Sequence, residues 1–431
     1  MNNTRETTRS PWAWIPTLYF AQGIPFVVVQ QMSVIMYKRL GISNADIAFY
    51  TSLMYLPWVI KPLWSPFVDM FSTKRAWTVS NQFIIGILLA GVAFALSLPS
   101  FFTWSIVVFW VMAFSSATHD IAADGFYMHA LDSHNQAAFV GVRSTFFRLA
   151  TIAGSGLLVM LAGMLESTSN SVSVAWSITF GVVAGAFILL FTYHKMMLPH
   201  PESDKPTISD KAAGVWGGFV KMFVLFFKKK DIVSIIAFLL LYRFAEAQLV
   251  KLVAPFLLDP RDKGGLGLTT SDVGLVYGTV GIIALTLGGL LGGFVASRQG
   301  LKFWLWIMVL SIHLPDAMFV YLSQVQPENM FIISAAVAIE QFGYGFGFTA
   351  YMLYMIIIAE GQHKTAHYAL CTGFMALGMM VPGMWSGDLQ EYLGYKNFFL
   401  WVILATIPCF AVAALAKIDP SFGKKAAPAQ K

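Results

Sequence analysis

Two acidic residues spaced four apart, Asp120 and Asp124, interrupt a long apolar stretch of the sequence. On a helix they share one face, and two such charges repel unless one carries a proton or both meet cations. The next apolar stretch supplies two cations, Arg143 and Arg148. A carboxylate that contacts an arginine in one conformation and loses it in another can bind and release a proton. We therefore expect Asp120 or Asp124 to couple protons to a conformational change. A fixed ion-pair network between the two helices is the alternative.

Two later apolar stretches carry acids in similar surroundings. Arg243 and Glu246 lie three residues apart in one of them and can pair along a helix. Glu340 lies in the other. A buried charge is costly unless it is compensated, so such acids need a reason to be there. Glu246 and Glu340 are accordingly further candidates for proton coupling.

Amide, phenol, imidazole and cationic side chains also recur within the apolar stretches. These groups suit a substrate that carries hydroxyl, N-acetyl and carboxylate groups. The candidates for substrate binding are Tyr19, Gln22, Gln30, His119, Arg143, Arg148, Arg243, Gln248, Lys251, Gln341, Tyr344 and Tyr351. Any single Gln or Tyr among them can instead make a helix–helix hydrogen bond. Gly343, Gly345 and Gly347 lie between the last of them, and we expect these glycines to serve packing or bending.

Other kinds of chemistry are not indicated. No nucleophile stands at a convincing spacing from a base and an orienting group, so an enzyme is not expected. Cys371 and Cys409 both lie in apolar stretches, where a cysteine serves as a small packing residue. No spacing of Cys and His suggests a metal site, and we expect neither a metal nor another cofactor.

The composition excludes an ordinary soluble protein. Of the 431 residues, 57% are hydrophobic and only 12% are charged, and the mean hydropathy is +0.67. A soluble domain carries roughly 25% charged residues, so the surface of this chain must face a lipid bilayer. The net charge of +6 does not indicate nucleic-acid binding, because the basic residues lie between apolar stretches rather than in one patch.

The apolar stretches predict an all-α integral membrane protein of about twelve spanning helices. No cleavable signal pattern precedes them. We expect a first set of six in residues 1–198, a linker at 199–231, and a second set of six with a tail in 232–431. The second part of the linker is amphipathic and should lie along the membrane surface, the alternative being an extension of the seventh helix. The expected helices lie near 12–36, 46–67, 77–97, 103–128, 141–165, 174–195, 232–258, 272–296, 303–323, 329–357, 366–388 and 396–416.

Basic residues in the loops predict the orientation. If both termini are cytoplasmic, eighteen Lys and Arg residues fall in cytoplasmic segments and five on the opposite side. Such a bias marks the cytoplasmic side of a membrane protein, and it supports an even number of spans.

Two loops repeat one pattern 228 residues apart, at Ser65–Arg75 and Gly293–Lys302. Both fit a degraded G-x-x-x-D-R/K-x-G-x-R/K-R/K, the loop signature of the major facilitator superfamily, and the resemblance covers the whole chain. It implies two pseudo-symmetric six-helix halves, in which the first, fourth, seventh and tenth helices line a central cavity. We expect the loops to act as cytoplasmic gates, with Asp69 as a latch; simple anchoring by positive charge is the alternative. The gating residues are Asp69, Lys74, Arg75, Arg298 and Lys302.

Four segments resemble the AmpG muropeptide permeases and their relatives, the acetyl-CoA transporters. The segment from the seventh helix onward, RFAEAQLVKLVAPFLLDPRDKGGLGLTTSDVGLVYGTVG, is similar in its acid, its F-L and its G-x-x-x-x-x-V-G run. The fourth expected helix reads THDIAADGFYMHAL, similar to S/A-x-Q-D-I-x-x-D-G/A-W, with His119 in place of Gln and Phe126 in place of Trp. The first, LYFAQGIPFVV, keeps a Gly and a Pro of that family. In the fifth, VRSTFFRLATIAGSGLLVML, Arg148 matches an inner arginine.

The resemblance implies a secondary transporter of the bacterial inner membrane that acts in peptidoglycan recycling. Its expected substrates are N-acetylglucosaminyl-anhydromuramyl sugars or muropeptides, imported by symport with protons, and its expected state is a monomer in the lipid bilayer. The alternatives are an importer of another oligosaccharide or amphiphilic anion, and a membrane sensor or scaffold that transports nothing.

Overall fold

The structure is a computed structural model that describes residues 9–206, 212–361, 364–420 and 422. Every regular element in these ranges is a helix, as the apolar stretches predict. The residues group by contact into two units. The first comprises Met1–Met32 and Ile60–Gly218, and the second comprises Ser33–Val59 and Phe219–Lys431. The expected boundaries at 198 and 232 do not foresee that Ser33–Val59 groups with the second unit.

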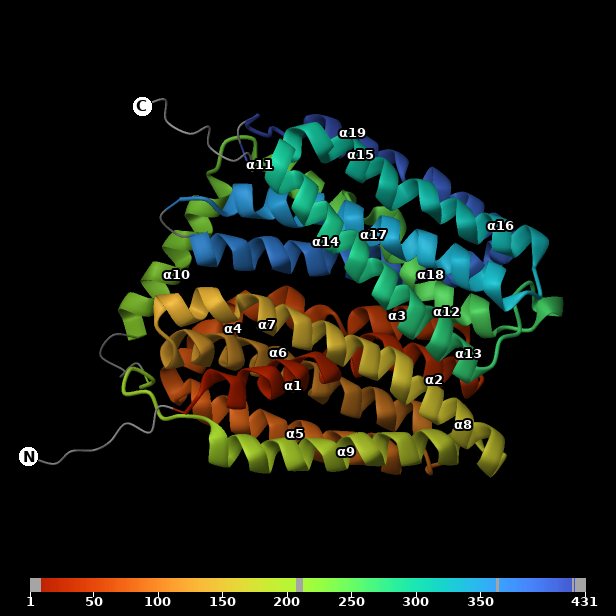
Figure 1. Cartoon of the computed structure of the whole chain (residues 1–431), viewed down its shortest axis with the longest axis horizontal. Coiled ribbons are helices and arrows are strands. Elements are labelled where there is room, and N and C mark those ends of the chain that lie inside the picture. Colours follow the sequence, from red (N-terminus) through yellow and green to blue (C-terminus); the bar gives the residue numbers. More distant parts are fainter. Residues whose placement is uncertain (1–8, 207–211, 362–363, 421, 423–431) are drawn as a thin grey trace, which may run out of the picture. The chain divides into compact units, whose positions relative to one another are not determined.

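The first unit is built from long helices of the N-terminal half. Several begin at a side-chain cap; the Thr73 hydroxyl, for example, accepts from the backbone N–H of Ala76. Within the unit, α5 packs against both α6 and α9 (Figure 1). The elements are η1 (Pro11–Ala13), α1 (Ile15–Val27), the π-helical η2 (Val28–Met32), α4 (Leu56–Phe71), which begins in the second unit, α5 (Lys74–Ala95), α6 (Phe101–Ala130), α7 (Ser133–Thr151), the π-helical η3 (Ile152–Leu158), α8 (Val159–Ser169) and α9 (Val172–Met197).

Two glycines bring α1 close to the helix that supplies the arginines. A Cβ at Gly23 would lie 2.7 Å from the Cβ of Ala150, and one at Gly154 would lie 2.6 Å from Cγ1 of Val27. Both distances are shorter than carbon atoms tolerate, so only glycine permits this approach. The contact fixes α1 against α7 and η3, and thereby sets the polar side chains of α1 beside α7.

The second unit contains most of the C-terminal half together with α2 and α3. Helix α10 (Ala212–Phe227) begins in the first unit and continues into the second, and it is separate from α11, because Asp231 takes a left-handed conformation (φ 61°) between them. The amphipathic segment is therefore not an extension of the seventh span. The elements are α2 (Ser33–Arg39), α3 (Asn44–Leu53), α11 (Ile232–Leu241), α12 (Phe244–Leu258), η5 (Arg261–Lys263), α13 (Thr270–Val273), the π-helical η6 (Gly274–Gly281), α14 (Ile282–Gln299), α15 (Leu301–His313), η7 (Leu314–Asp316), α16 (Ala317–Val325), α17 (Met330–Ala359), α18 (Lys364–Leu404) and α19 (Ile407–Leu415).

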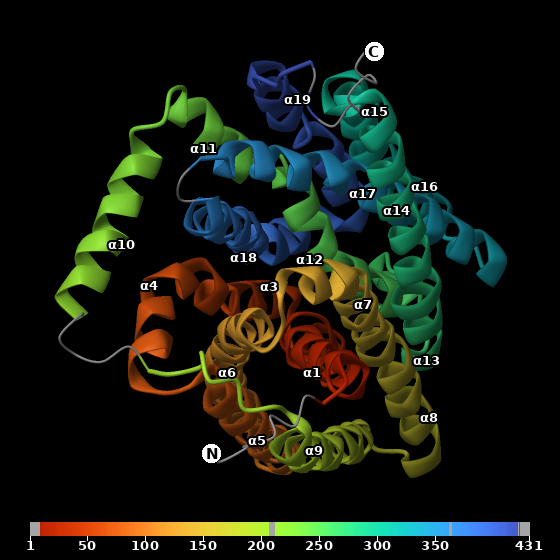
Figure 2. The same cartoon turned by 60° about the vertical axis from the view of Figure 1, so that its left-hand side comes forward.

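Helix α17 packs against both α14 and α15 (Figure 2). A Cβ at Gly345 would lie 2.0 Å from the carbonyl oxygen of Leu285 in α14. A Cβ at Gly343 would lie 2.1 Å from that of Ser311, and one at Gly347 would lie 2.4 Å from that of Met308. Backbone meets backbone on two sides of α17, which confirms that the glycine run serves packing.

The segment Ser33–Val59 is held to the second unit by polar side chains. Lys38 of α2 forms an ion pair of 2.7 Å with Asp259, which follows α12. The Asn44 amide donates to Oε1 of Gln390 in α18 at 2.6 Å and to the Tyr395 hydroxyl at 2.9 Å. Tyr395 in turn donates to Asp259 at 2.6 Å. We call these five side chains the clasp.

In the described part of the chain, ten helical segments are long and apolar enough to cross a membrane, so the expected count of twelve is not reached by this measure. Two places account for the difference. The expected helix at 46–67 is divided into α3 and α4 by a turn at Met54 and Tyr55. The expected helices at 366–388 and 396–416 follow one another in a single segment, with Gly394 (φ 70°) at the kink between them.

Candidate functional site

The first unit gathers its polar groups around the two acids of α6. The Asp124 carboxylate lies 2.5 Å from the Arg143 guanidinium of α7 and accepts from the Tyr19 hydroxyl of α1 at 3.2 Å. The Arg143 guanidinium also lies over two rings, 4.4 Å from the centroid of Tyr19 and 4.5 Å from that of Tyr127. The expected pairing of Asp124 with an arginine of the next helix is therefore present.

Asp120 has a different pair of partners. It accepts from the Gln22 amide of α1 and forms an ion pair with Lys61 of α4. The Lys61 and Asp120 side chains are 27% and 22% exposed, and those of Arg143 and Asp124 are 26% and 39% exposed, so neither pair is sealed. Two acids thus face two cations, an arrangement that is electrically neutral and within reach of solvent.

Lys61 is the partner that sequence reasoning missed. It is a lysine within an apolar stretch, which was the one available signal, but nothing in the sequence links it to an acid 59 positions later. Arg148, expected beside the two acids, is partly buried farther along α7. Gln30, a candidate for substrate binding, is buried within η2.

His119 lies outside this group, although it precedes Asp120 in sequence. Its Nε2 lies 3.1 Å from the Gln82 amide nitrogen, and Oε1 of Gln82 lies 2.9 Å from Nδ1 of His194. Nε2 of His194 in turn lies 2.9 Å from the Thr17 hydroxyl. His119, Gln82 and His194 are buried. The expectation that His119 binds substrate is not supported, because its imidazole belongs to a buried hydrogen-bond chain in the core of the unit.

In the second unit, Arg243 stands at the break between α11 and α12. Its Nη2 donates to the Tyr344 hydroxyl, and its guanidinium lies 4.7 Å from the centroid of Phe348. Its Nε is buried and has no hydrogen-bond partner. The expected pair with Glu246 does not form, because both Glu246 oxygens lack a hydrogen-bond partner and Arg243 is turned to Tyr344.

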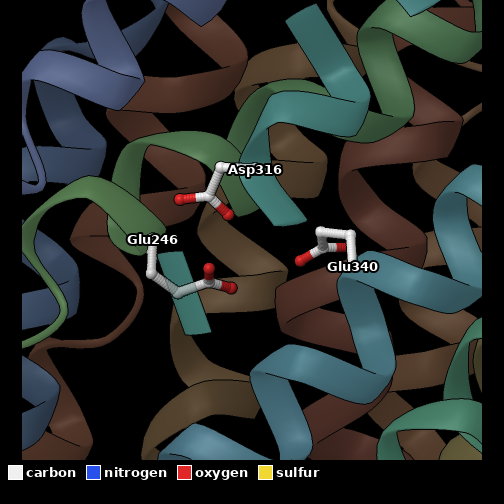
Figure 3. Close-up of side chains that lie close together, drawn as sticks. All are labelled: Glu246, Asp316 and Glu340. Atoms are coloured by element: carbon white, nitrogen blue, oxygen red, sulfur yellow. The ribbon is translucent and has the colours of Figure 1, made fainter. Parts of the chain in front are cut away.

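Glu246 and Glu340 instead lie with a third acid, Asp316. One carboxylate oxygen of each lies within 4.8 Å of the others, and Figure 3 shows the three groups turned toward a common space. They come from α12, η7 and α17. The Gln341 amide donates to Oε2 of Glu340 at 2.9 Å. Asp316 is an acid within an apolar stretch to which the sequence alone assigned no role.

Three further candidates make contacts within the second unit. The Lys251 ammonium donates to the Thr51 hydroxyl at 3.1 Å and lies 5.2 Å from the centroid of Tyr55. Oε1 of Gln248 accepts from the Trp401 indole at 2.9 Å. The Tyr351 hydroxyl donates to the carbonyl of Leu239 at 2.6 Å. Gln248 and Tyr351 thus make the helix–helix bonds that were their alternative role.

Lys74 and Arg75, the bases of the first expected gating loop, make hydrogen bonds at the ends of helices. The backbone N–H groups of Lys74 and Arg75, at the start of α5, both donate to the Asp204 carboxylate, at 2.7 and 2.9 Å. The Arg75 guanidinium donates to the carbonyls of Lys195 and Leu198, at the end of α9. An acid at a helix start and a base at a helix end both stabilise the helices.

The other expected gating residues are Asp69, Arg298 and Lys302. Asp69 belongs to α4, but its side chain lies outside the described side chains, so its role as a latch stays a prediction. In the second loop the Arg298 guanidinium lies 4.3 Å from the centroid of Phe294, and Lys302 is exposed.

A family model described as Major Facilitator Superfamily matches residues 17–380. The chain belongs to this superfamily. Among solved structures, the nucleoside transporter NupG has a TM-score of 0.67 at 17% identity, covering 94% of this chain and 99% of that chain. A bacterial homologue of the human lysosomal transporter Spinster has a TM-score of 0.66 at 14% identity, covering 95% and 96%. The expected major facilitator fold is confirmed.

Proteins with similar sequences indicate which group within the superfamily the chain resembles. The "Putative transporter AmpG 4" of Rickettsia conorii is 25% identical over 408 residues, which cover 92% of this chain and 94% of the relative. The "Anhydromuropeptide permease" of Escherichia coli (strain K12) is 25% identical over 399 residues, covering 91% and 76%. The expected resemblance to AmpG is confirmed, and the chain is a multi-pass membrane transporter of this superfamily.

Proposed function

We propose that the chain is a proton-coupled symporter that imports N-acetylglucosaminyl-anhydromuramyl sugars or muropeptides across the bacterial inner membrane. The observation that carries the coupling is the pair of α6 acids, Asp120 and Asp124, each held by its own cation and partly exposed. The substrate class rests on the names of the relatives, which include an anhydromuropeptide permease matched over 91% of this chain.

Proton coupling follows from what Asp124 would meet as its surroundings change. While Arg143 lies 2.5 Å away, its positive charge favours the charged form of the Asp124 carboxylate. If α7 moves away from α6, Asp124 loses this cation and keeps Asp120 one helical turn away. The loss of the cation and the remaining acid both favour the protonated form. A carboxyl group that alternates in this way ties the binding of one proton to one conformational cycle.

A substrate carboxylate has a ready partner in Arg243. Its guanidinium is held by the Tyr344 hydroxyl and stacked on Phe348, yet its Nε–H lacks an acceptor. A buried donor without a partner is costly, and a substrate oxygen would relieve that cost. Arginine suits this role because its planar fork matches a carboxylate.

The proposed orientation places both termini in the cytoplasm, since the excess of loop Lys and Arg favours that side. Cys371 and Cys409 are buried, so a cysteine introduced at Lys205 or Lys263 can be labelled by a thiol reagent that does not cross the membrane. Labelling of Lys263→Cys in intact cells, and of Lys205→Cys only after lysis, is the expected pattern. Equal labelling of both in intact cells would refute this topology.

Uptake into proteoliposomes tests the function. Labelled anhydromuropeptide should accumulate when an inward proton gradient is imposed, and free sugars and acetyl-CoA should not. Asp124→Asn should abolish accumulation while leaving exchange of substrate between the two sides. Asp388→Asn is the matched control, since Asp388 is an exposed acid of α18. Accumulation that ignores the proton gradient contradicts symport. The absence of any uptake would favour a sensor or scaffold.

A further inference from the structure

The clustered acids of the second unit, Glu246, Asp316 and Glu340, are buried. Glu246 is 0% exposed, and Asp316 and Glu340 are each 1% exposed. They converge from α12, η7 and α17, three elements that are far apart in the sequence (Figure 3). Carboxylates are rarely fully buried without a compensating charge, since removing an ion from water is expensive.

Almost none of the carboxylate oxygens has a partner. Both oxygens of Glu246, both of Asp316 and Oε1 of Glu340 are buried without a hydrogen-bond partner; Oε2 of Glu340 accepts from Gln341. Unsatisfied buried acceptors on this scale are exceptional in a native protein and point to a missing ligand.

A fourth side chain near the cluster, that of His313, also lacks a hydrogen-bond partner. His313 precedes η7 and is 3% exposed. Its Nδ1 lies 3.6 Å from Oδ2 of Asp316 and has no hydrogen-bond partner. That separation is too long for a hydrogen bond, but it is ordinary for two ligands of one cation. This imidazole nitrogen lies beside one acid of the cluster, and carboxylate oxygens together with an imidazole nitrogen are ligands that metals recognise.

The charges leave a defined deficit. Fully ionised, the three carboxylates would carry three negative charges, and a neutral His313 would add none. Arg243 lies three residues before Glu246 in the sequence, and its guanidinium donates to the Tyr344 hydroxyl. If Arg243 offsets one charge, two negative charges remain, which is the charge that one divalent cation neutralises.

We propose that Glu246, Asp316, Glu340 and His313 form a binding site for one divalent metal cation within the second unit. Because one oxygen of each acid lies within 4.8 Å of the other two, a point exists within about 2.8 Å of all three. Metal–oxygen bonds of about 2.0–2.6 Å are reached from there by small side-chain adjustments. The ligand set suits Mn²⁺ or Zn²⁺, which accept both carboxylate oxygen and imidazole nitrogen.

Glu246 and Glu340 were also candidates for proton coupling, but the proposed function assigns that role to Asp120 and Asp124 of the first unit, so this site is distinct from the proposed coupling pair. Its cation would join α12, η7 and α17, and it would stabilise those contacts whether or not substrate moves. Binding at equilibrium therefore tests the site without reference to transport.

The experiment uses the full chain, purified without a polyhistidine tag and stripped with EDTA, with Mn²⁺ as the probe. Electron paramagnetic resonance of unbound Mn²⁺ should reveal one saturable site per chain at neutral pH, and a Mn²⁺-dependent rise in the unfolding temperature should accompany it. Asp316→Asn and Glu340→Gln should each bind Mn²⁺ at least tenfold more weakly. Asp388→Asn removes an exposed acid of α18 and should bind like the unaltered chain.

Co²⁺ provides a second readout, because its visible absorption reports its ligands. His313→Gln should change the spectrum of bound Co²⁺ more than Asp388→Asn does. If Asp316→Asn does not fold, the unaltered chain and Glu340→Gln decide the question. The proposal is overturned if neither Mn²⁺ nor Zn²⁺ saturates a site, if Glu340→Gln binds as tightly as the unaltered chain, or if only protons or Na⁺ stabilise the protein.

Discussion

Replacing Gly345 by alanine should destabilise the second unit by an amount that its geometry sets. The added Cβ would lie 2.0 Å from the carbonyl oxygen of Leu285, 2.8 Å from its carbonyl carbon and 3.0 Å from the backbone nitrogen of Gly289. All three atoms belong to the backbone of α14, so no side chain can rotate away. Helices α17 and α14 must separate by about 1 Å to restore an ordinary contact, an overpacking that typically costs about 1–3 kcal/mol.

Alanine also favours a helix over glycine, by about 1 kcal/mol. The net loss at Gly345 should therefore be about 0–2 kcal/mol, and the gap to a variant that gains only the helix propensity should be about 1–3 kcal/mol. Gly185 in α9 is the matched control, because a Cβ there would meet nothing within 4 Å. Gly185→Ala should leave the protein as stable as before or slightly more stable. Denaturation by a graded fraction of sodium dodecyl sulfate in mixed micelles would measure both variants. Equal stability of Gly345→Ala and Gly185→Ala would refute the reasoning.

Substitutions at three other places give shorter tests. Arg143→Met should lower stability by about 1 kcal/mol or somewhat more, since the pair with Asp124 is partly exposed. The double variant that also carries Asp124→Asn should recover part of that loss in the same denaturation assay. Lys38→Met and Asp259→Asn should each cost about 1–3 kcal/mol, because their ion pair is only 14% and 11% exposed, and a double-mutant cycle that shows strictly additive losses would contradict a direct interaction. Asp132 precedes α7 and accepts from the backbone N–H of Asn135, which lowers the pKa of its carboxyl group. Its contribution to stability is therefore present above its unfolded pKa and is lost as the pH falls through the folded value. The stability of Asp132→Asn should depend less on pH below about 4, and unfolding measured between pH 3 and pH 7 should show this difference.

Hydropathy and spacing predicted the fold class because both are local properties of the sequence. Twenty apolar residues in a row need no knowledge of their neighbours to be recognised as a membrane helix. The loop repeat then supplied the superfamily. The division of 46–67 into α3 and α4 was missed because the apolar stretch continues through the turn at Met54 and Tyr55; its one signal is Pro57, in the first turn of α4, where proline is tolerated.

The site was harder to predict, since its contacts join distant helices. Asp124 and Arg143 could be paired because they lie on successive helices. Lys61 and Asp120 lie two helices apart, and Asp316 meets Glu246 and Glu340 only through the packing of three elements. His119 misled for the opposite reason: it adjoins Asp120 in sequence, but adjacent residues on a helix point about 100° apart, and its partner Gln82 lies on α5.

The clasp has a consequence for any motion between the halves of the repeat. The chain enters Ser33–Val59 from η2 and leaves it through α4, both of which continue into the first unit, while Lys38 and Asn44 fasten it to α12 and α18. The segment is thus a tether: the chain at both of its ends continues into the first unit, and its middle is fastened to the second unit. A rearrangement must either break the clasp or bend the tether near its ends. The π-helix η2 lies just before the segment, and the turn at Met54 and Tyr55 lies just before α4. Helical chains bend most readily at such places, and hydrogen exchange should first respond to substrate there.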